Sequence, residues 1–484
     1  MRETIRFLLG DEEQSIAGLP PTMTVLEWLR GPARLCGTKE GCAEGDCGAC
    51  TVVLGEVVDG ALHYRAVNAC ILFIPSLDGR QLLTVEHLRG PDGALHPVQQ
   101  AMVTHHGSQC GFCTPGFVMS LFALYHAGTG APRREANEAL AGNLCRCTGY
   151  RPILEATKSS CAGPPADRFA AAAAETVRRL LAFGSDPLGV VQGEARFLVP
   201  RSADQVDGLL QNWPDATLVA GGTDVGLWVT KLHKSLPTVI ALDRAGDLAT
   251  VEQRDGLLRI GAGVTYEDAL GAIAGLWPEF GRMIRRIGSR QIRNRGTIGG
   301  NVANASPIGD TPPALIALGT ILVLRGGGAR RRIPAEEFFE GYRRTALKRG
   351  EFLECLEIPL PKVRQHFASY KVTKRLEQDI SAVCAAFLVT LDDGCVSDIR
   401  IAYGGMAAIP IRAIRTEFAL IGQPWTPEGI AAGMRTLGEE LSPISDMRAS
   451  APYRRMVARN LLHRFQLETA PDQTSIVRLS EVQT

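Results

Sequence analysis

Two sets of four cysteines in the first third of the chain constrain its fold more than any other feature. The first set comprises Cys42, Cys47, Cys50 and Cys70, and its first three members follow the pattern C-x4-C-x2-C. This is the spacing of plant-type 2Fe–2S centres. Zinc sites usually repeat C-x2-C pairs instead, so zinc is the weaker interpretation. The first set therefore predicts a small domain folded around a loop that holds an iron–sulfur cluster.

Glycines alternate with the cysteines of the first set, at Gly41, Gly45 and Gly48. Thiolates carry negative charge, so the loop must bring backbone N–H groups close to sulfur, and glycine allows the backbone to turn that tightly. Cys36 breaks the spacing. We expect Cys36 to be a small buried residue or a free thiol, and not a ligand.

The second set comprises Cys110, Cys113, Cys145 and Cys147. Residues 116–127 have helical periodicity, and Thr114–Pro115 would supply the N-cap and first turn, which places Cys113 at a helix N-terminus that favours a thiolate. Further helices are expected over 133–140 and from Pro152. Two cysteine pairs about thirty residues apart could also bind zinc. The second set predicts a helical bundle around a metal centre, either a second 2Fe–2S cluster or zinc.

The bulk composition narrows the function classes. The chain has 484 residues, enough for three or four domains, and its 52 Lys+Arg against 51 Asp+Glu give no sign of nucleic acid or of an anionic membrane as a partner. The N-terminus lacks the apolar core of a signal peptide, and no run of 18 apolar residues occurs. Thirteen cysteines in such a chain fit metal ligation in a reducing compartment, so we expect a cytoplasmic protein that does not enter a membrane.

Residues 3–9, 51–54 and 62–69 alternate like strands, with a polar turn at residues 11–13 and a short helix over 25–30 capped by Thr24. This mixture predicts an α+β, ferredoxin-like domain. Further strands are expected over Leu257 to Val264, Ala382 to Leu391 and Val396 to Tyr403. Helices are expected after the last two.

Two glycine-rich segments follow predicted strands or helices. Ala220 to Asp224 ends a strand and would present successive N–H groups and a Thr hydroxyl to an anion such as a pyrophosphate. Residues 299–301 and 304–310 could form a second clamp. Each segment could equally be a tight strand–helix turn. No G-x-G-x-x-G follows a strand, because Gly261-Ala262-Gly263 lacks the third glycine, so a Rossmann nicotinamide site is not supported.

Over residues 3–465 the chain resembles the molybdenum hydroxylase family, and within it the small iron–sulfur and flavin subunit of bacterial xanthine dehydrogenases. The motifs that carry the resemblance are G-T-K-E-G-C-A-E-G-D-C-G-A-C (37–50), Q-C-G-F-C-T-P-G (109–116), N-L-C-R-C-T-G-Y-R-P-I (143–153), V-A-G-G-T-D-V (219–225) and G-T-I-G-G-N-V-A-N-A-S-P-I-G-D (296–310). Their order, with cluster domains before a flavin domain in one chain, matches the family's bipartite members.

The resemblance implies a multidomain α+β architecture. Its expected parts are a β-grasp 2Fe–2S domain (1–82), a helical-bundle 2Fe–2S domain (83–160), a linker with one helical segment (161–195), a vanillyl-alcohol-oxidase-type FAD-binding domain (196–364), a C-terminal α+β flavin-closing domain (365–467) and a polar, frayed tail (468–484).

The resemblance also implies the flavin contacts. The pyrophosphate would be wrapped by Leu218, Val219, Ala220, Gly221, Gly222, Thr223, Asp224 and Val225. The phosphates and the adenosine side would meet Thr297, Gly300, Asn301, Asn304 and Asp310. Leu353 would lie against the flavin ring, Lys371 at its carbonyl region, and Asp379–Ile380 would close the site. Two positions depart from the pattern: Asn304 stands where many relatives have Thr, and Ile287 where relatives often have an aromatic residue beside the nicotinamide.

On this resemblance the chain is the small, electron-transfer subunit of an NAD-dependent xanthine dehydrogenase of purine catabolism, which oxidises hypoxanthine and xanthine to urate. Electrons would pass from molybdenum through two 2Fe–2S clusters to FAD and then NAD. No large substrate region fits within the 484 residues, so a large molybdopterin-binding partner is expected, in a heterotetramer of two small and two large chains. No catalytic acid–base set is apparent in this chain, since His63, His96, His105 and His106 are scattered and suit surface or helix-cap roles.

Two alternatives remain at this level. The same type of subunit could serve an aldehyde or azaheterocycle hydroxylase with a different electron acceptor. A non-catalytic redox or zinc protein that uses the cysteine sets to bind partners would be a different class altogether, and a zinc protein would be colourless.

Overall fold

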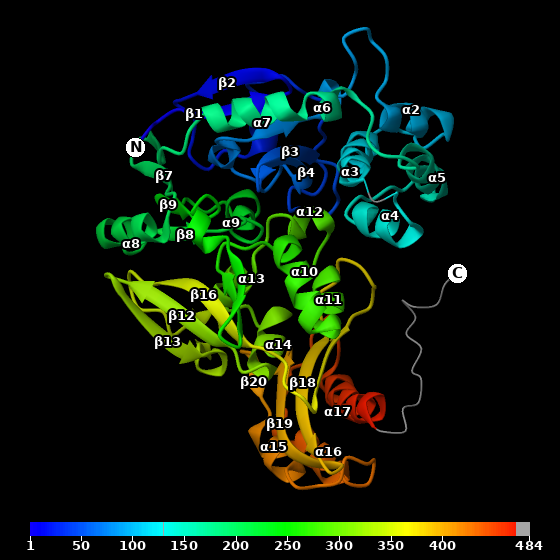
Figure 1. Ribbon diagram of the computed structural model, residues 1–484, viewed down its shortest axis with the longest axis vertical. Helices are drawn as coiled ribbons and strands as arrows, with labels where there is room; N and C mark the ends of the chain where they lie inside the picture. The colour runs from blue at the N-terminus through cyan, green and yellow to red at the C-terminus, as the bar shows by residue number, and fades with distance from the viewer. Residues whose placement is uncertain (129, 471–484) are drawn as a thin grey trace. The chain divides into compact units, whose positions relative to one another are not determined.

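A computed structural model describes residues 1–128 and 130–470, which fold as two compact units (Figure 1). Unit 1 contains residues 1–249, 265–268 and 288–297. Unit 2 contains residues 250–264, 269–287 and the described chain from 298 onward. The chain therefore passes between the units several times, and the flavin-domain segment predicted over 196–364 contributes to both.

Unit 1 begins with a five-stranded mixed sheet in the order β2-β1-β5-β3-β4, in which only β1 and β5 pair in parallel. Its elements are β1 (Ile5–Leu9), β2 (Glu12–Ile16), α1 (Val25–Arg30), β3 (Thr51–Val58), β4 (Ala61–Asn68) and β5 (Gln81–Leu83). The cap predicted for α1 is present as a capping box between Thr24 and Glu27.

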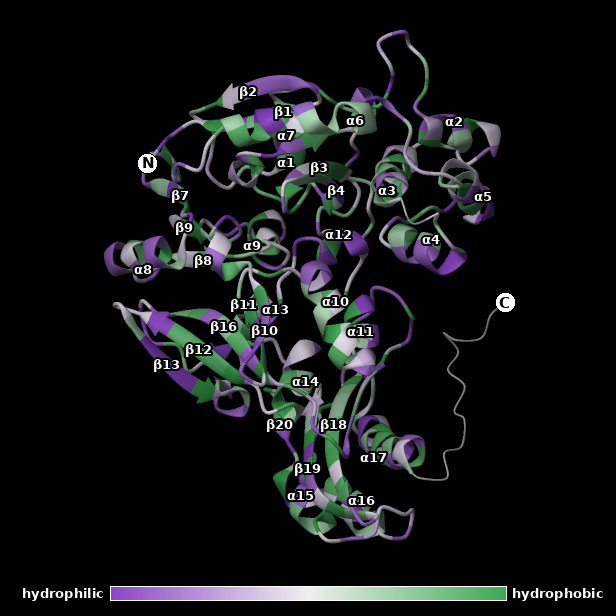
Figure 2. Ribbon diagram, in the orientation of Figure 1, coloured by the Kyte–Doolittle hydropathy of each residue, from purple (hydrophilic) through white to green (hydrophobic). Residues whose placement is uncertain are grey.

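The polar turn expected at residues 11–13 is wrong in part, because Glu12 and Glu13 already belong to β2. β2 is an edge strand, and Figure 2 shows it as largely hydrophilic. Charged residues on an edge strand keep it from pairing with other chains, and they also hide it from a search for apolar alternation.

Four helices follow: α2 (Pro97–Thr104), α3 (Thr114–Ala127), α4 (Arg133–Leu140) and α5 (Arg151–Ser160). They lie beside one another (Figure 1) around a core that includes Phe117, Phe122 and Ile153, each fully buried. The predicted helices are confirmed, but Thr114 is the first residue of α3 and not its cap. Cys113 holds the N-cap position, without a side-chain cap bond.

The segment 161–195 is more ordered than the partly ordered linker expected from its composition. It forms α6 (Arg168–Ala171), α7 (Ala173–Ala182) and β6 (Leu188–Gln192). Leu180 and Phe183 pack on Leu8 of the first sheet. We call residues 161–187 the strap, because this segment runs from the helical region back across the sheet (Figure 1).

A second sheet completes unit 1, in the order β6-β7-β9-β8. The new elements are β7 (Ala195–Val199), α8 (Ala203–Asn212), β8 (Thr217–Val219), α9 (Val225–Thr230), β9 (Thr238–Ala241) and α12 (Arg290–Arg293). One apolar core joins this sheet to the first, and in it Phe73 and Phe197 meet edge to face at 6.0 Å. The two sheets are therefore packed as one body.

Unit 2 contains two larger antiparallel sheets, β10-β11-β16-β12-β13 and β17-β18-β19-β20, and a small ribbon, β14-β15. The strands are β10 (Val251–Arg254), β11 (Leu257–Gly261), β12 (Ile321–Gly326), β13 (Ala329–Pro334), β14 (Phe339–Gly341), β15 (Arg344–Thr345), β16 (Phe352–Pro359), β17 (Gln365–Val372), β18 (Val383–Asp392), β19 (Cys395–Gly404) and β20 (Ile411–Arg412). The helices are α10 (Tyr266–Leu276, whose first three residues belong to unit 1), α11 (Pro278–Arg285), α13 (Ile298–Ala303), α14 (Thr311–Ala317), α15 (Ile414–Leu420), α16 (Ala431–Glu440) and α17 (Ala451–Thr469).

Short 3-10 helices occur at Ile74–Leu77, Val85–His87, Gly246–Leu248 and Ala335–Glu337. The glycine- and asparagine-rich segment 295–310, expected to connect two helices, itself contains α13. Most of the predicted polar tail, residues 471–484, lies outside the described residues, and α17 continues to Thr469. No helix in the described part of the chain is long and apolar enough to cross a membrane.

Candidate functional site

The first cysteine set lies in the loop between α1 and β3 and just after β4. The N–H groups of Glu44, Asp46 and Cys47 lie 3.4, 3.4 and 3.3 Å from the Cys42 sulfur. The Cys47 thiol and these N–H groups lower the pKa of Cys42 to about 4. Donors directed at a thiolate are what an iron–sulfur cluster requires of its loop.

The four thiols of this set form two contacting pairs, Cys42 with Cys47 and Cys50 with Cys70. Cys50 and Cys70 are each 2% exposed. Cys36 lies outside both pairs and is exposed, so of the two roles expected for it the structure supports the free thiol and excludes burial.

Two glycines allow the loop its close approaches. A Cβ on Gly41 would lie 2.8 Å from the Cys47 sulfur, and one on Gly48 would lie 2.2 Å from the carbonyl oxygen of Gly142. Gly48 also has φ +69°. The amide of Asn143 donates to Gly48 O at 3.0 Å, so the first cysteine loop touches the segment that precedes Cys145. The expected need for glycine here is confirmed.

The second cysteine set comes from two loops of the helical region. Cys110 and Cys113 precede α3, and Cys145 and Cys147 lie between α4 and α5. The thiols again pair, Cys113 with Cys145 and Cys110 with Cys147. Burial and the Cys145 thiol raise the pKa of Cys113 to about 12. Four converging thiols suit either iron–sulfur or zinc, so geometry alone leaves this choice open.

Three exposed apolar side chains occur among the residues next to the second set. Cys110 and Cys147 are exposed. Phe112, Leu144 and Tyr150, which alternate with the cysteines along the chain, are 49%, 49% and 39% exposed. We call these three residues the apolar rim. Exposed aromatic and aliphatic side chains grouped in this way mark interaction surfaces.

The glycine-rich loop that follows β8 belongs to unit 1. A Cβ on Gly221 would lie 1.8 Å from the carbonyl oxygen of Arg295, and Gly222 has φ +77°, so both positions require glycine. The Asp224 carboxylate accepts a bond from the Trp228 indole N–H at 3.2 Å. Glycine here permits close packing of the loop on Arg295 and a left-handed turn, which is the kind of tight turn that can present successive backbone N–H groups to an anion.

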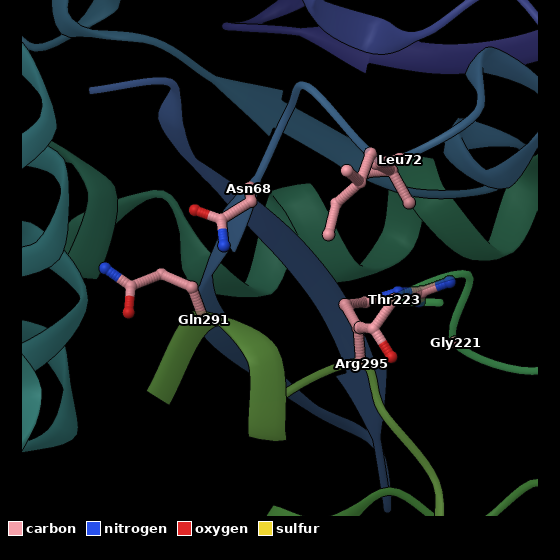
Figure 3. Close-up of a pocket in the computed structure, with 7 residues that line it drawn as sticks. Asn68, Leu72, Gly221, Thr223, Gln291 and Arg295 are labelled. Carbon is pink, nitrogen blue, oxygen red and sulfur yellow. The ribbon is translucent and has the colours of Figure 1, made fainter. Parts of the chain in front are cut away.

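The segment after Cys70 packs against this loop. A Cβ on Gly226 would lie 2.7 Å from the carbonyl oxygen of Ile71. A small cavity separates the two segments (Figure 3), and its wall consists of Asn68, Ile71, Leu72, Gly221, Thr223, Gln291 and Arg295. Its volume of about 10 Å³ has room for about one water molecule. Sequence reasoning did not identify this junction of the cluster loop with the glycine-rich loop.

A chain of ion pairs supports the same junction. Arg80 contacts Glu56 at 2.5 Å and Asp243 at 3.0 Å, and Arg295 contacts Asp243 at 2.9 Å. Although burial opposes ionisation, Arg80 and the neighbouring arginines lower the pKa of both Glu56 and Asp243 to about 2. Thus β3 and β5 of the first sheet are joined electrostatically to the end of β9.

The remaining predicted flavin residues divide between the units. Thr297 belongs to unit 1, where it pairs with Thr265. Gly300, Asn301, Asn304, Asp310, Leu353 and Lys371 belong to unit 2. Within unit 2, Leu353 is buried in β16, and the side-chain amide oxygen of Asn301 accepts a bond from the Thr311 hydroxyl at 2.5 Å.

Asp310 and Lys371, which the resemblance assigned to different ends of the flavin, lie together. They form a buried ion pair in which the side chains are 7% and 3% exposed. The Ser381 hydroxyl donates to the second oxygen of the Asp310 carboxylate. Arg286 donates to the Lys371 carbonyl at 2.7 Å and to the Thr373 hydroxyl at 2.9 Å. In this structure the Lys371 ammonium is therefore engaged by a carboxylate.

The histidines have structural roles, as expected for His96, which caps α2. Sequence reasoning missed that His96 and His126 both contact the Asp167 carboxylate of the strap, at 2.5 and 2.9 Å. The three side chains lie close enough to share a metal ion. The backbone N–H of Val98 is directed at Nδ1 of His96, which makes that atom an acceptor and Nε2 the N–H donor to Asp167. A donor at Nε2 favours a hydrogen-bonded cluster over a metal site.

Three domain models match the chain. They are described as a [2Fe-2S] binding domain (residues 84–158), an FAD binding domain in molybdopterin dehydrogenase (193–361) and a CO dehydrogenase flavoprotein C-terminal domain (368–469). The first contains all four cysteines of the second set, so the zinc alternative is set aside.

The chain is similar over most of its length to xanthine dehydrogenases. It is 32% identical to that of Emericella nidulans, over 96% of this chain and 38% of the relative. It is 31% identical to the xanthine dehydrogenase/oxidase of Gallus gallus, over 92% and 38%. The chain thus spans well under half the length of these curated relatives.

Solved structures cover a shorter part. Carbon monoxide dehydrogenase from Hydrogenophaga pseudoflava is 29% identical with a TM-score of 0.53, over 57% of this chain and 96% of that one. Quinoline 2-oxidoreductase from Pseudomonas putida 86 is 27% identical with a TM-score of 0.52, over 56% and 95%.

Proposed function

The chain belongs to the molybdenum hydroxylase family, as the iron–sulfur and flavin portion of a xanthine-dehydrogenase-type member, and from this premise we propose that it transfers electrons in a xanthine dehydrogenase. In this proposal, hypoxanthine and xanthine are oxidised at molybdenum on a large partner chain, and NAD is the final acceptor. Iron–sulfur centres carry single electrons, and a flavin converts them into a two-electron transfer.

Each expected cofactor has residues of fitting chemistry. Two sets of four converging thiols fit two 2Fe–2S centres, held by Cys42, Cys47, Cys50 and Cys70 and by Cys110, Cys113, Cys145 and Cys147. The Gly221–Gly222 turn, which follows β8 and has glycine at a close backbone contact and at a positive φ, fits the FAD pyrophosphate loop of the family pattern. From the family resemblance we further propose FAD contacts for Thr297, Gly300, Asn301, Asn304, Asp310, Leu353 and Lys371.

The observation that carries the proposal is the packing of Ile71 against Gly226. Ile71 follows the ligand Cys70 directly, and Gly226 follows the loop proposed to hold the flavin. A ligand of the first centre and the flavin loop are thus neighbours within one compact unit. Such proximity is expected of a one-electron path and has no use in a zinc protein.

The apolar rim supports the proposal that a large partner chain docks at the second centre, at the opposite end of the electron path from the flavin. The second centre, with exposed Cys110 and Cys147, is the one accessible to another chain. Phe112, Leu144 and Tyr150 would be covered when the molybdopterin-binding chain docks there. We propose the same order as the family pattern: partner, second centre, first centre, flavin.

A second candidate is the same electron-transfer role in an enzyme for an aldehyde or another azaheterocycle. The similarity to quinoline 2-oxidoreductase, which covers nearly all of that solved chain, favours keeping this candidate. The substrate pocket would lie on the partner, so the residues of this chain do not distinguish the two.

The test is reconstitution. The purified chain should show flavin and broad iron–sulfur absorbance, with about four irons per chain. Coexpressed with its large partner, it should reduce NAD with xanthine, and less well with quinoline or benzaldehyde. A colourless chain would refute the electron-transfer role. Faster turnover of quinoline or an aldehyde would refute the xanthine assignment alone, and reduction of only artificial acceptors would refute NAD.

A further inference from the structure

The segment from Cys145 to Tyr150 closes on itself through hydrogen bonds around one ligand sulfur. The Thr148 hydroxyl lies 3.2 Å from the Cys145 sulfur, and the Thr148 N–H lies 3.5 Å from it. The Tyr150 N–H donates to the Thr148 hydroxyl oxygen at 3.2 Å. The Cys145 N–H donates to the Tyr150 hydroxyl at 3.0 Å. The side chain of Thr148 is thereby placed between the sulfur and the following turn.

The direction of these bonds follows from their donors. The Thr148 oxygen already accepts the Tyr150 N–H, so its own proton is available to the sulfur. A thiolate that ligates iron has no proton and can only accept. The Thr148 O–H therefore donates to Cys145 when a cluster is bound.

The backbone is strained to achieve this arrangement. Gly149 and Tyr150 both have left-handed conformations, with φ +65° and +69°. For a tyrosine this conformation costs about 1–3 kcal/mol and persists only where neighbouring contacts enforce it. Two successive left-handed residues turn the chain back, so that Tyr150 reaches both Thr148 and Cys145. Because this conformation is costly, the hydrogen bonds within the segment must hold the turn in place.

The arrangement is specific to one ligand. Across residues 1–128 and 130–470, Cys145 is the only one of the ligand cysteines whose sulfur has a hydroxyl within hydrogen-bonding distance. Apart from the thiol of Cys47, itself a member of the set, the donors to Cys42 are backbone N–H groups, which a side-chain substitution does not remove. Thr148 thus gives the second set a hydroxyl donor, whereas the side chain that approaches a sulfur of the first set is the amide of Asn68, 4.0 Å from Cys50.

We propose that Thr148 is a positioning residue that raises the reduction potential of the second iron–sulfur centre through its hydrogen bond to the Cys145 thiolate. Reduction adds negative charge to a centre that is already anionic, so a donor to sulfur stabilises the reduced state more than the oxidised state. The inference rests on the proposed function, because it requires a 2Fe–2S centre on the second cysteine set. Beyond the proposed function, it identifies Thr148 as the residue that sets the reduction potential of the second centre relative to that of the first centre.

The experiment is a redox titration of the full chain, followed by electron paramagnetic resonance, in four variants. Thr148→Val and Thr148→Ala remove the hydroxyl, and Thr148→Ser keeps it. Thr114→Val is the matched control, since Thr114 also adjoins a ligand cysteine but bonds to Ser108. In each variant the reduction potential of the first centre serves as an internal reference, because it should not change.

We expect Thr148→Val and Thr148→Ala to lower the potential of the second centre only, with about a tenfold weaker reduction equilibrium, which is about 59 mV for one electron. Thr148→Ser should titrate like the unmodified chain, and so should Thr114→Val. An unchanged second potential in both hydroxyl-free variants, with full iron content, would overturn the inference. Loss of the second centre in both would also overturn it, because Thr148 would then serve assembly. A single reducible centre in the unmodified chain would instead refute the proposed function.

Discussion

The first cysteine set is built into the core of unit 1, with Cys50 and Cys70 each 2% exposed, whereas Cys110 and Cys147 of the second set are exposed at the surface. Backbone N–H groups surround Cys42. A threonine side chain and an apolar rim accompany the second set instead. The buried set adjoins the glycine-rich loop, and the exposed set is open to a partner. In the proposed path, the buried set exchanges electrons within the chain and the exposed set exchanges them with the partner.

Removing one ligand from each set is the strongest way to test this comparison. Cys47→Ser should abolish the first centre and Cys113→Ser the second, each lowering iron from about four to about two per chain and removing one paramagnetic signal. Cys36→Ser should change neither signal, because Cys36 is exposed and lies outside both sets. Loss of both signals in either ligand variant would show that the two sets do not act as separate centres.

The glycine-rich loop can be blocked without touching a cysteine. Gly221→Val places atoms where the Arg295 carbonyl lies, 1.8 Å from a Cβ, so the loop must shift. We expect FAD affinity to fall about tenfold or more, equivalent to at least about 1.4 kcal/mol, with both iron–sulfur signals retained. Gly208→Ala in α8, where a Cβ meets nothing within 4 Å, is the control. Full FAD occupancy in Gly221→Val would remove this loop from the flavin site.

The apolar rim offers a test of the exposed side. Phe112→Asp or Leu144→Asp should weaken binding to the large partner about thirtyfold, because an apolar anchor at an interface contributes about 2 kcal/mol. Iron content should stay constant. Phe418→Asp, at a position 73% exposed in α15 of unit 2, should bind normally. Equal affinities, measured by titration calorimetry or surface binding, would place the partner elsewhere.

A smaller effect, on the free energy of unfolding, is expected from the strap, which contacts the regions that hold the two cysteine sets. Asp167 accepts bonds from His96 and His126 of the helical region, while the next residue, Arg168, bonds to the His87 carbonyl and to Asp11 of the first region. Asp167→Asn should cost about 1–3 kcal/mol of unfolding free energy at pH 7.

The sign of the pH dependence follows from Asp167. Despite its burial, hydrogen bonds from both histidines and from the Ala170 N–H hold the pKa of Asp167 well below its ordinary value. Its stabilisation is therefore present above the unfolded pKa of about 3.9 and is lost as the pH falls below that value toward the lowered folded pKa. Urea unfolding at pH 7 and about pH 3 should show a smaller difference in Asp167→Asn than in the unmodified chain. Identical differences would mean that Asp167 is not a determinant of acid stability.

Local sequence signals were accurate where the residues concerned lie within a turn or two of one another. The Thr24 cap, the boundaries of α4 and the position of Cys113 at the start of α3 follow from nearest neighbours, since capping and helical periodicity act over three or four residues. The cysteine spacing likewise predicted both sets of converging thiols, because each pair of ligands needs its own short loop.

Contacts between distant segments were not predictable in this way. No sequence signal near Asp167 predicts its hydrogen bonds with His96 and His126, which are 71 and 41 residues away in the chain. The strap therefore resembled a linker in composition although it is fully folded. β2 was not predicted, because the polar residues of this edge strand do not show apolar alternation. The buried ion pair between Asp310 and Lys371, 61 residues apart, was likewise not predicted from the sequence.

The sequence by itself predicted the eight candidate ligand cysteines, the glycines of their loops and the family to which the chain belongs, because spacing and small residues are properties of short segments. Only the tertiary structure decided that Ile71 lies against Gly226, that one set is buried and the other exposed, and that Thr148 contacts a ligand sulfur. These features arise from the shared apolar core of the two sheets in unit 1 and from a strained turn. Packing of remote segments and the cost of strain are settled by the whole fold, and no local pattern encodes them.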